Sequence, residues 1–201
     1  MKTASRLFHF LHEQHGLFVY FLEGQKLVHD LVTLKTISGS SFEIFRGATL
    51  FGAILSNFVK QGETQGLFLD TNSFSLKVEV NSEAMMRVFF KESSNLTPSQ
   101  QGPLLNCSGT MRIVKKFPHS NNPYTTFIEL KDDSIEQLVN KTLVQSYQIE
   151  SFYHCSDVSD QAILICKMPE SQRTALKVKE EDLIGPKEYF LKNKKNLFSF
   201  F

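Results

Sequence analysis

Hydrophobic and polar residues alternate most regularly over residues 74–80. The apolar side chains there are Phe74, Leu76, Val78 and Val80, and the positions between them hold Ser, Lys and Glu. A period of two predicts a β-strand with one buried side and one side facing solvent. Turn-forming residues follow at 81–83, and a second apolar stretch occupies 85–90. This part of the chain therefore predicts an antiparallel hairpin.

Further strands are predicted where short apolar runs are bounded by turn-forming residues. These runs occupy residues 17–22, 67–69, 110–117, 124–130, 151–155 and 162–168. The segment 156–160 contains Ser and Asp residues that favour a tight turn. We therefore expect the last two runs to form a second hairpin.

A long helix is predicted to begin at Ser40, because Ser40 and Glu43 have the spacing of a capping box. Apolar residues then recur every three or four positions on one helical face, at Ile44, Ala48, Phe51, Leu55 and Phe58, with Phe45 and Ile54 widening it. Gly47 and Gly52 interrupt this helix, and each costs about 1 kcal/mol relative to Ala. Their presence predicts that a neighbouring element approaches the helix closely. Gly62 is predicted to end this helical region in a left-handed conformation.

Three shorter helices are predicted at 25–34, at 133–143 and at 5–15. Helical spacing of Leu residues marks the first, and Asp133 with Glu136 gives the second a capping signature. The third is a short amphipathic segment carrying His9, His12 and His15, which a helix spreads around its axis.

Together these elements predict an α+β fold class, with antiparallel β-sheets and segregated helices packed on them. The composition changes after Pro169, because residues 170–181 are polar and charged and Gly185-Pro186 breaks the chain. We therefore expect one domain over residues 1–169. Residues 170–201 are predicted to form a linker or a C-terminal arm, helical or extended.

Composition and charge give no reason to expect nucleic acid or a membrane as a partner. The chain has 201 residues with 41% apolar and 21% charged residues, as in ordinary globular proteins. The formal net charge of +1 gives no indication of nucleic acid or of an anionic membrane surface. No signal peptide or membrane span is expected. The cysteines are Cys107, Cys155 and Cys166, an odd number without a C-x-x-C pair, which favours reduced thiols in a cytoplasmic protein.

The sequence contains no motif that indicates a catalytic or cofactor site. It contains no nucleophile elbow, phosphate loop or H-E-x-x-H motif. The acidic residues at 132–133 and 180–182 are interpreted as helix caps and solvated surface. Cys166 is predicted to be a buried side chain, and His154 and Cys155 point to opposite faces of one strand. We therefore expect no enzyme, no bound metal and no cofactor.

A resemblance to the heat-shock protein 33 family begins at Tyr124, in the stretch YTTFIELKDDSIEQLVNKTLVQSYQIESFYHC. In that family a strand beginning Tyr-x-Gly leads through an acidic turn into a helix that ends Ser-Glu-Gln, followed by another strand. The residues in register are Tyr124, Glu129, Leu130, Asp133, Ser134, Ile135, Ser146, Gln148 and Ile149. The order of elements agrees from residue 7 to residue 169, where the family also ends a strand with Met/Leu-Pro.

The chain departs from the family in three places. Residues 70–73 lack the Gly and Pro of the family's turn, and Thr125-Thr126 replaces the Gly that follows the strand's Tyr. The C-terminal C-x-C and C-x-x-C pairs, which hold zinc in the family, are missing. The resemblance therefore implies the family's N-terminal domain alone, without the zinc/cysteine module.

The resemblance implies an ATP-independent holdase, a chaperone that binds unfolded or aggregation-prone proteins through apolar surface. The zinc redox switch does not carry over. Self-association as a homodimer is also implied, since the family dimerises partly through its linker arm. The alternative is a non-chaperone interaction module of the same fold that binds one specific partner or itself.

The candidate client-binding residues are the apolar side chains of the C-terminal segment. They are Phe190, Leu191, Leu197, Phe198, Phe200 and Phe201. Exposed apolar patches often mark interaction sites, although these side chains have the alternative of packing back on the domain.

Overall fold

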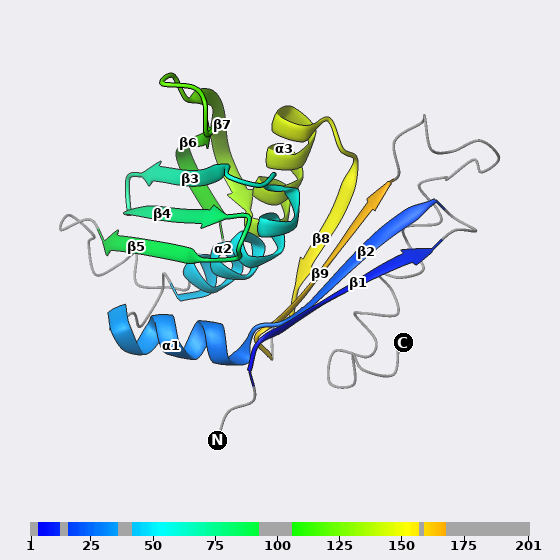
Figure 1. The fold of residues 1–201 in the computed structure, drawn as a ribbon. Helices are drawn as coiled ribbons and strands as arrows, with labels where there is room; N and C mark the ends of the chain where they lie inside the picture. Colours follow the sequence, from blue (N-terminus) through cyan, green and yellow to red (C-terminus); the bar gives the residue numbers. More distant parts are fainter. Residues whose placement is uncertain (1–3, 13–15, 36–41, 93–105, 157–158, 168–201) are drawn as a thin grey trace.

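The computed structural model describes residues 4–12, 16–35, 42–92, 106–156 and 159–167, and all structural statements concern these residues. Two antiparallel sheets form the fold (Figure 1). The four-stranded sheet has the order β1 (Arg6–His12), β2 (Leu17–Glu23), β9 (Gln161–Lys167), β8 (Ser151–Cys155). The five-stranded sheet has the order β5 (Met86–Glu92), β4 (Phe74–Asn81), β3 (Thr64–Thr71), β6 (Asn106–Lys116), β7 (Tyr124–Ser134). The predicted α+β class is confirmed.

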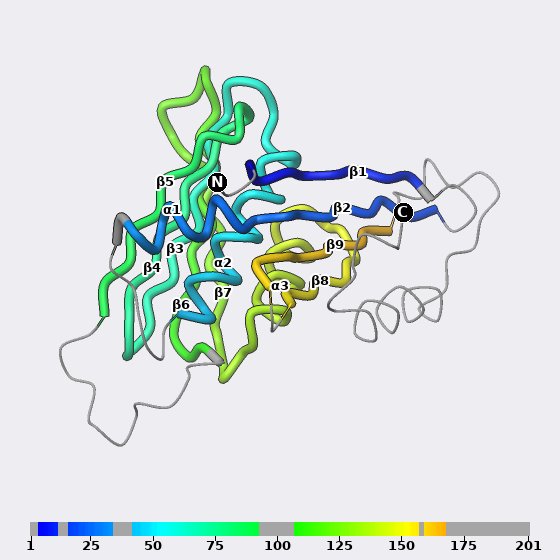
Figure 2. The backbone as a smooth tube through the Cα atoms, turned by 90° about the horizontal axis from the view of Figure 1, so that it is seen from below, coloured from blue at the N-terminus to red at the C-terminus, as the bar shows by residue number. Residues whose placement is uncertain are grey.

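Both hairpins predicted from the sequence are present. β4 pairs with β5 and β8 pairs with β9, each antiparallel. The alternation over 74–80 matches the observed burial, because every second side chain of β4, beginning at Phe74, is buried. The pairing of β2 with β9 is long-range and joins Leu17 to Lys167. Figure 2 shows β1, β2, β9 and β8 lying side by side in this order.

The helix α2 (Phe42–Leu55) lies between the two sheets (Figures 1 and 2). It packs on β4 and β5 of one sheet and on β2 and β9 of the other. The sequence predicted a single apolar face, but residues 44–52, Ile54 and Leu55 are all buried. A helix enclosed by two sheets is buried on all sides, which is the physical reason for the difference.

Gly47 and Gly52 mark close approaches of α2 to neighbouring elements, as the sequence predicted. A Cβ added to Gly47 would lie 2.7 Å from Ile135 Cγ1, and one added to Gly52 would lie 2.5 Å from Val78 Cγ1. Both distances are far below van der Waals contact, so only glycine fits.

The capping box expected at the beginning of α2 stays a prediction. Ser40 lies outside the described residues, and Glu43 forms an ion pair with the Arg46 guanidinium at 2.6 Å. The buried Arg46 also donates hydrogen bonds of 2.7 Å to the carbonyl oxygens of Ser156 and Ser159. Arg46 thereby ties α2 to the turn between β8 and β9. The helix α1 (Gln25–Lys35) confirms the predicted 25–34 helix. The 3-10 turn η2 (Ser56–Phe58) follows α2, and Gly62 adopts a φ of +78°, the left-handed conformation predicted for it.

The helix α3 (Ile135–Tyr147) is capped by Ser134, not by Asp133 as predicted. The Ser134 hydroxyl accepts from the Gln137 amide, and the Gln137 side chain accepts from the Ser134 amide at 2.8 Å. Because β7 continues through Ser134, Asp133 still belongs to the strand. Its buried carboxylate pairs with Lys141 at 2.6 Å, so the interpretation of Asp133 as solvated surface is also wrong.

The predicted helix over residues 5–15 is wrong, because residues 6–12 form strand β1. β1 pairs with β2 from Arg6↔Glu23 to His12↔Leu17. A short apolar run fits either state, and the neighbouring strand β2 decides between them by supplying the backbone hydrogen bonds of the ladder. None of the helices in the described part of the chain is long and apolar enough to cross a membrane.

Candidate functional site

The six apolar residues predicted to bind clients, Phe190, Leu191, Leu197, Phe198, Phe200 and Phe201, lie outside the described residues. Their role stays a prediction. The described strands and helices contain another surface of the same apolar chemistry.

The four-stranded sheet has a second apolar face, directed away from α2. Its buried members are Leu17, Val19, Phe21, Ile163 and Ile165. The half-buried side chains of Phe8, Phe10 and Phe152 pack against them. We call these eight residues the sheet-face cluster. All of them come from strands, whereas α2 and α3 contribute to the main core on the other face.

Strand alternation explains why this sheet has two apolar faces. In β2, Leu17, Val19 and Phe21 belong to the sheet-face cluster, while Phe18 and Leu22 belong to the main core. β9 divides its side chains in the same way. Strands that are apolar on both sides are typical of sheets covered on both faces.

The strand register makes the sheet-face cluster continuous. Val19 is paired with Ile165 and Phe21 with Ile163. The Phe8 ring lies 6.3 Å from the Phe21 ring, a normal distance for an aromatic pair. The surface therefore runs without a polar gap over β1, β2 and β9.

Burial within the sheet-face cluster is uneven. Its five central members are at most 6% exposed, although the described helices pack on the opposite face. Phe8, Phe10 and Phe152 retain partial exposure. The segment 168–201 follows β9 directly in the sequence, and β9 is a central strand of this sheet.

The three cysteines are buried and do not form a redox pair. Burial raises the pKa of the thiols of Cys107, Cys155 and Cys166 to about 12, so they stay protonated at neutral pH. Cys155 is paired with Ala162 and Cys166 with Ser151, at opposite ends of the β8–β9 hairpin. Four strand residues separate these ends by roughly 13 Å, too far for a disulfide. Cys166 is a core side chain, as predicted.

His154 contacts an acidic side chain of α3. Its Nδ1 lies 3.4 Å from Glu136 Oε1 at the start of α3. Burial alone would raise the pKa of Glu136, but hydrogen bonds with His154 and Ser134 outweigh it and hold the pKa below its usual value. Among the described residues, no group of three or more His, Cys, Asp or Glu side chains has a geometry that could hold a metal ion.

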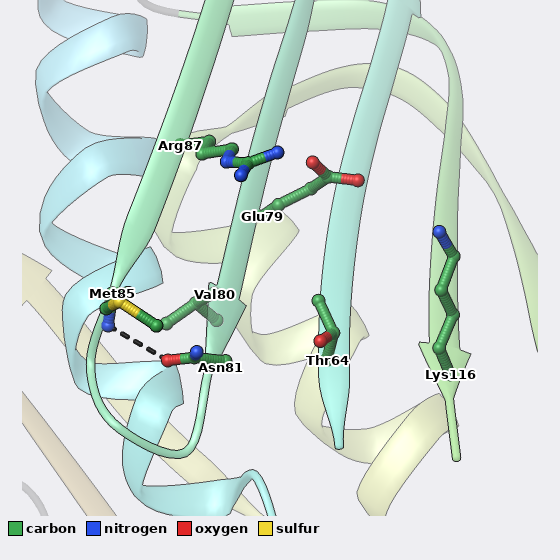
Figure 3. A pocket seen from close by; sticks show the side chains of 7 residues that line it. All are labelled: Thr64, Glu79, Val80, Asn81, Met85, Arg87 and Lys116. Atoms are coloured by element: carbon green, nitrogen blue, oxygen red, sulfur yellow. Dashed lines mark hydrogen bonds between the residues drawn. The ribbon is translucent and has the colours of Figure 1, made fainter. Parts of the chain in front are cut away.

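A hollow of about 300 Å³ lies on the other sheet, near one end of β3, β4, β5 and β6 (Figure 3). Its lining residues are Thr64, Glu79, Val80, Asn81, Met85, Arg87 and Lys116. Its one carboxylate, that of Glu79, already pairs with Lys77 at 3.0 Å, and the Asn81 side chain accepts from the Met85 amide to hold the turn. The hollow therefore contains no arrangement of acid, base and nucleophile that would support catalysis.

The architecture matches a chaperone of known structure. The crystal structure of a 33 kDa chaperonin, a heat shock protein 33 homolog from Thermotoga maritima, superimposes with a TM-score of 0.70 at 14% identity. The match covers 95% of this chain and 67% of that chain. At this identity the likeness shows the shared fold. No curated protein sequence matches the chain.

The fold is thus the one seen in that heat shock protein 33 homolog. The family model described as Hsp33 protein matches residues 5–195, and the chain belongs to the Hsp33 family. The resemblance first seen in the stretch from Tyr124 is therefore confirmed. The sequence did not indicate the sheet-face cluster, because its members are distant in the chain and meet only through the pairing of β2 with β9.

Proposed function

We propose that this protein is an ATP-independent holdase that binds unfolded or aggregation-prone proteins through the sheet-face cluster. The proposal includes a cytoplasmic location, no catalytic activity and no zinc redox switch. The observation that carries it is the second apolar face of the four-stranded sheet, which is continuous over three strands.

The chemistry of this face suits unfolded polypeptides. It is built from aliphatic and aromatic side chains without a buried charge, so it favours apolar segments without selecting a sequence. Burying one such side chain contributes about 1.5–3 kcal/mol. A few client side chains are therefore enough to hold a collapsed chain, and their binding requires no ATP.

The C-terminal segment is the proposed competitor for this face. Residues 170–201 begin three positions after Lys167, where β9 ends. Their apolar side chains, named above as client-binding candidates, have the chemistry to cover the sheet-face cluster. In this proposal the arm protects the cluster at rest, and clients displace it.

Point substitutions in the full-length chain test this arrangement. A chemically denatured model protein is diluted into solution with and without the chaperone, and light scattering reports aggregation. Replacing Phe198, Phe200 and Phe201 together with Ser weakens the cover and should increase suppression of aggregation. Replacing Phe10 and Phe152 with Ser should decrease suppression.

Val144→Ser on α3 is the matched control, since this side chain is 50% exposed and lies outside the sheet-face cluster. Adding peroxide should change nothing, because the described thiols are buried and protonated. Absence of suppression at any chaperone ratio would contradict the proposal. A single tight partner in a pull-down would then favour the interaction-module alternative.

A further inference from the structure

The outer face of the five-stranded sheet carries a row of alternating rings and cations. Strand register places Phe89, Lys77, Phe68, Arg112 and Phe127 next to one another, one residue from each strand. We call these five residues the aromatic–cation row. Four strand spacings of about 4.8 Å give it a length of roughly 19 Å.

The centre of the row is held in place by cation–π contacts. Lys77 Nζ lies 4.9 Å and Arg112 Cζ lies 4.7 Å from the centre of the Phe68 ring. The ring itself leans over Gly66, where an added Cβ would lie 2.6 Å from it. Both cations therefore sit on a ring that is fixed to the sheet, which lowers the entropy cost of using them in binding.

The ends of the row are open to solvent. Phe127 is 67% exposed and Phe89 is 50% exposed. The helices α2 and α3 pack on the opposite face of this sheet, against side chains such as Val78 and Val88. Single exposed rings occur on ordinary surfaces, but here both lie in one row with Phe68 and two cations, and this alignment indicates an interaction site.

At the centre of the aromatic–cation row, the charge that a partner can contact is positive. Lys77 shares its charge with Glu79, whereas Arg112 forms no ion pair within the described part of the chain. An acidic side chain of a partner would therefore gain a guanidinium that, among the described residues, contacts an aromatic ring and no acid. The exposed rings at the two ends would receive apolar or aromatic side chains of the same partner.

The neighbouring positions disfavour a nucleic acid. Asp70 and Glu129 flank the row on the outer face of β3 and β7, and Glu79 lies on its other side. Glu79 pairs with Lys77 and Glu129 with Lys131, so these cations and carboxylates offset one another. With Asp70 also beside the row and a net charge of only +1, the face lacks the continuous positive charge that a phosphate backbone requires. A polypeptide can place its few acidic groups at the centre of the row and avoid the flanking carboxylates.

We propose that the aromatic–cation row is a second docking surface, specific for polypeptide segments with an acidic centre and apolar or aromatic flanks. The surface belongs to a different sheet from the sheet-face cluster and does not depend on it. It would give the protein a preference among its partners that the purely apolar cluster lacks.

Fluorescence anisotropy with the full-length protein tests the proposal. The probe is a labelled twelve-residue peptide with Asp and Glu at its centre and Phe and Leu at both ends. A matched peptide carries Lys in place of the acids, and a third probe is a twenty-nucleotide oligouridine. We expect the acidic peptide to bind about tenfold more tightly than the basic one, and added salt to weaken its binding. Equal binding of both peptides, or tighter binding of the oligouridine, overturns the proposal.

Substitutions within the aromatic–cation row test whether the peptide binds there. Phe127→Ser and Arg112→Gln should each weaken binding of the acidic peptide about tenfold, and Arg112→Gln should also reduce the salt dependence. Val144→Ser, a substitution of similar exposure on α3, should leave the affinity unchanged. Unaltered binding in both row variants refutes the assignment. Melting curves confirm folding, and Phe89→Ser replaces any row variant that melts early. Aggregation suppression is measured on the same proteins. A row that does not bind the peptide therefore leaves the proposed holdase function intact, and a protein that does not suppress aggregation leaves the proposed peptide binding intact.

Discussion

Replacing Gly52 with Ala tests how tightly α2 is held against the five-stranded sheet. The new Cβ would lie 2.5 Å from Val78 Cγ1 and 3.2 Å from Met86 Sδ. Carbon atoms in contact prefer about 3.5–4.0 Å, so the overlap with Val78 is roughly 1 Å. Val78 is 1% exposed in β4 between β3 and β5, and a β-branched side chain there has little freedom to move.

Two opposing effects set the magnitude. Overpacking a core costs about 1–3 kcal/mol, and an overlap this large with a rigid side chain belongs at the upper end. Ala in place of Gly stabilises a helix by about 1 kcal/mol. We therefore expect Gly52→Ala to lower the free energy of unfolding by about 2 kcal/mol.

The same substitution should change sign when Val78 is shortened. Val78→Ala removes Cγ1 and leaves the flexible Met86 as the nearest neighbour. In that background Gly52→Ala should raise the free energy of unfolding by up to about 1 kcal/mol, a coupling of about 3 kcal/mol between the two positions. Urea unfolding followed by circular dichroism measures all four proteins of the cycle. Equal effects of Gly52→Ala in both backgrounds would refute the reasoning.

Three further predictions concern capping, thiols and pH. Ser134→Ala removes the cap of α3 and should destabilise the protein by about 1 kcal/mol in urea unfolding, while an unchanged midpoint would contradict the capping role. Because burial raises the pKa of the thiols of Cys155 and Cys166 to about 12, neither should react with a thiol reagent at pH 8 until urea unfolds the chain, and fast reaction of the folded protein would contradict this. The pKa of Glu136 is lowered in the folded state, so its contribution to stability is complete above its unfolded pKa of about 4.3 and is lost as pH falls through the lower folded value. Glu136→Gln should therefore make stability fall less steeply between about pH 5 and pH 3, whereas parallel curves for the two proteins would exclude this carboxylate as a source of acid sensitivity.

The local sequence pattern was sufficient to predict an element wherever the conformation of that element depends mainly on its own residues. The alternation that begins at Phe74 predicted β4, and Gly47 and Gly52 predicted the close approaches of α2. The pattern gave the wrong secondary structure or the wrong burial where a neighbouring element determines them. Residues 6–12 form a strand because β2 lies beside them, and α2 is buried all round because two sheets enclose it.

The two candidate surfaces could not be predicted from the sequence, because each depends on which strands lie side by side. The sheet-face cluster requires β2 beside β9, and the aromatic–cation row requires β6 beside β3. Phe68 and Arg112 are far apart in the chain, and nothing in their local sequence indicates that they lie together. The strands that contain Arg112 and Phe127 were predicted from the sequence, but only the strand order makes these two residues neighbours.

The partnership of β2 with β9 has a consequence for synthesis on the ribosome. β2 ends at Glu23, and the strands that complete its sheet begin only at Ser151 and Gln161. At ordinary elongation rates of about 5–20 residues per second, the nascent chain spends roughly ten seconds with one side of α2 lacking its sheet. A protein that we propose to shield the apolar surfaces of others thus exposes an apolar surface of its own during synthesis, until β8 and β9 are available to cover it.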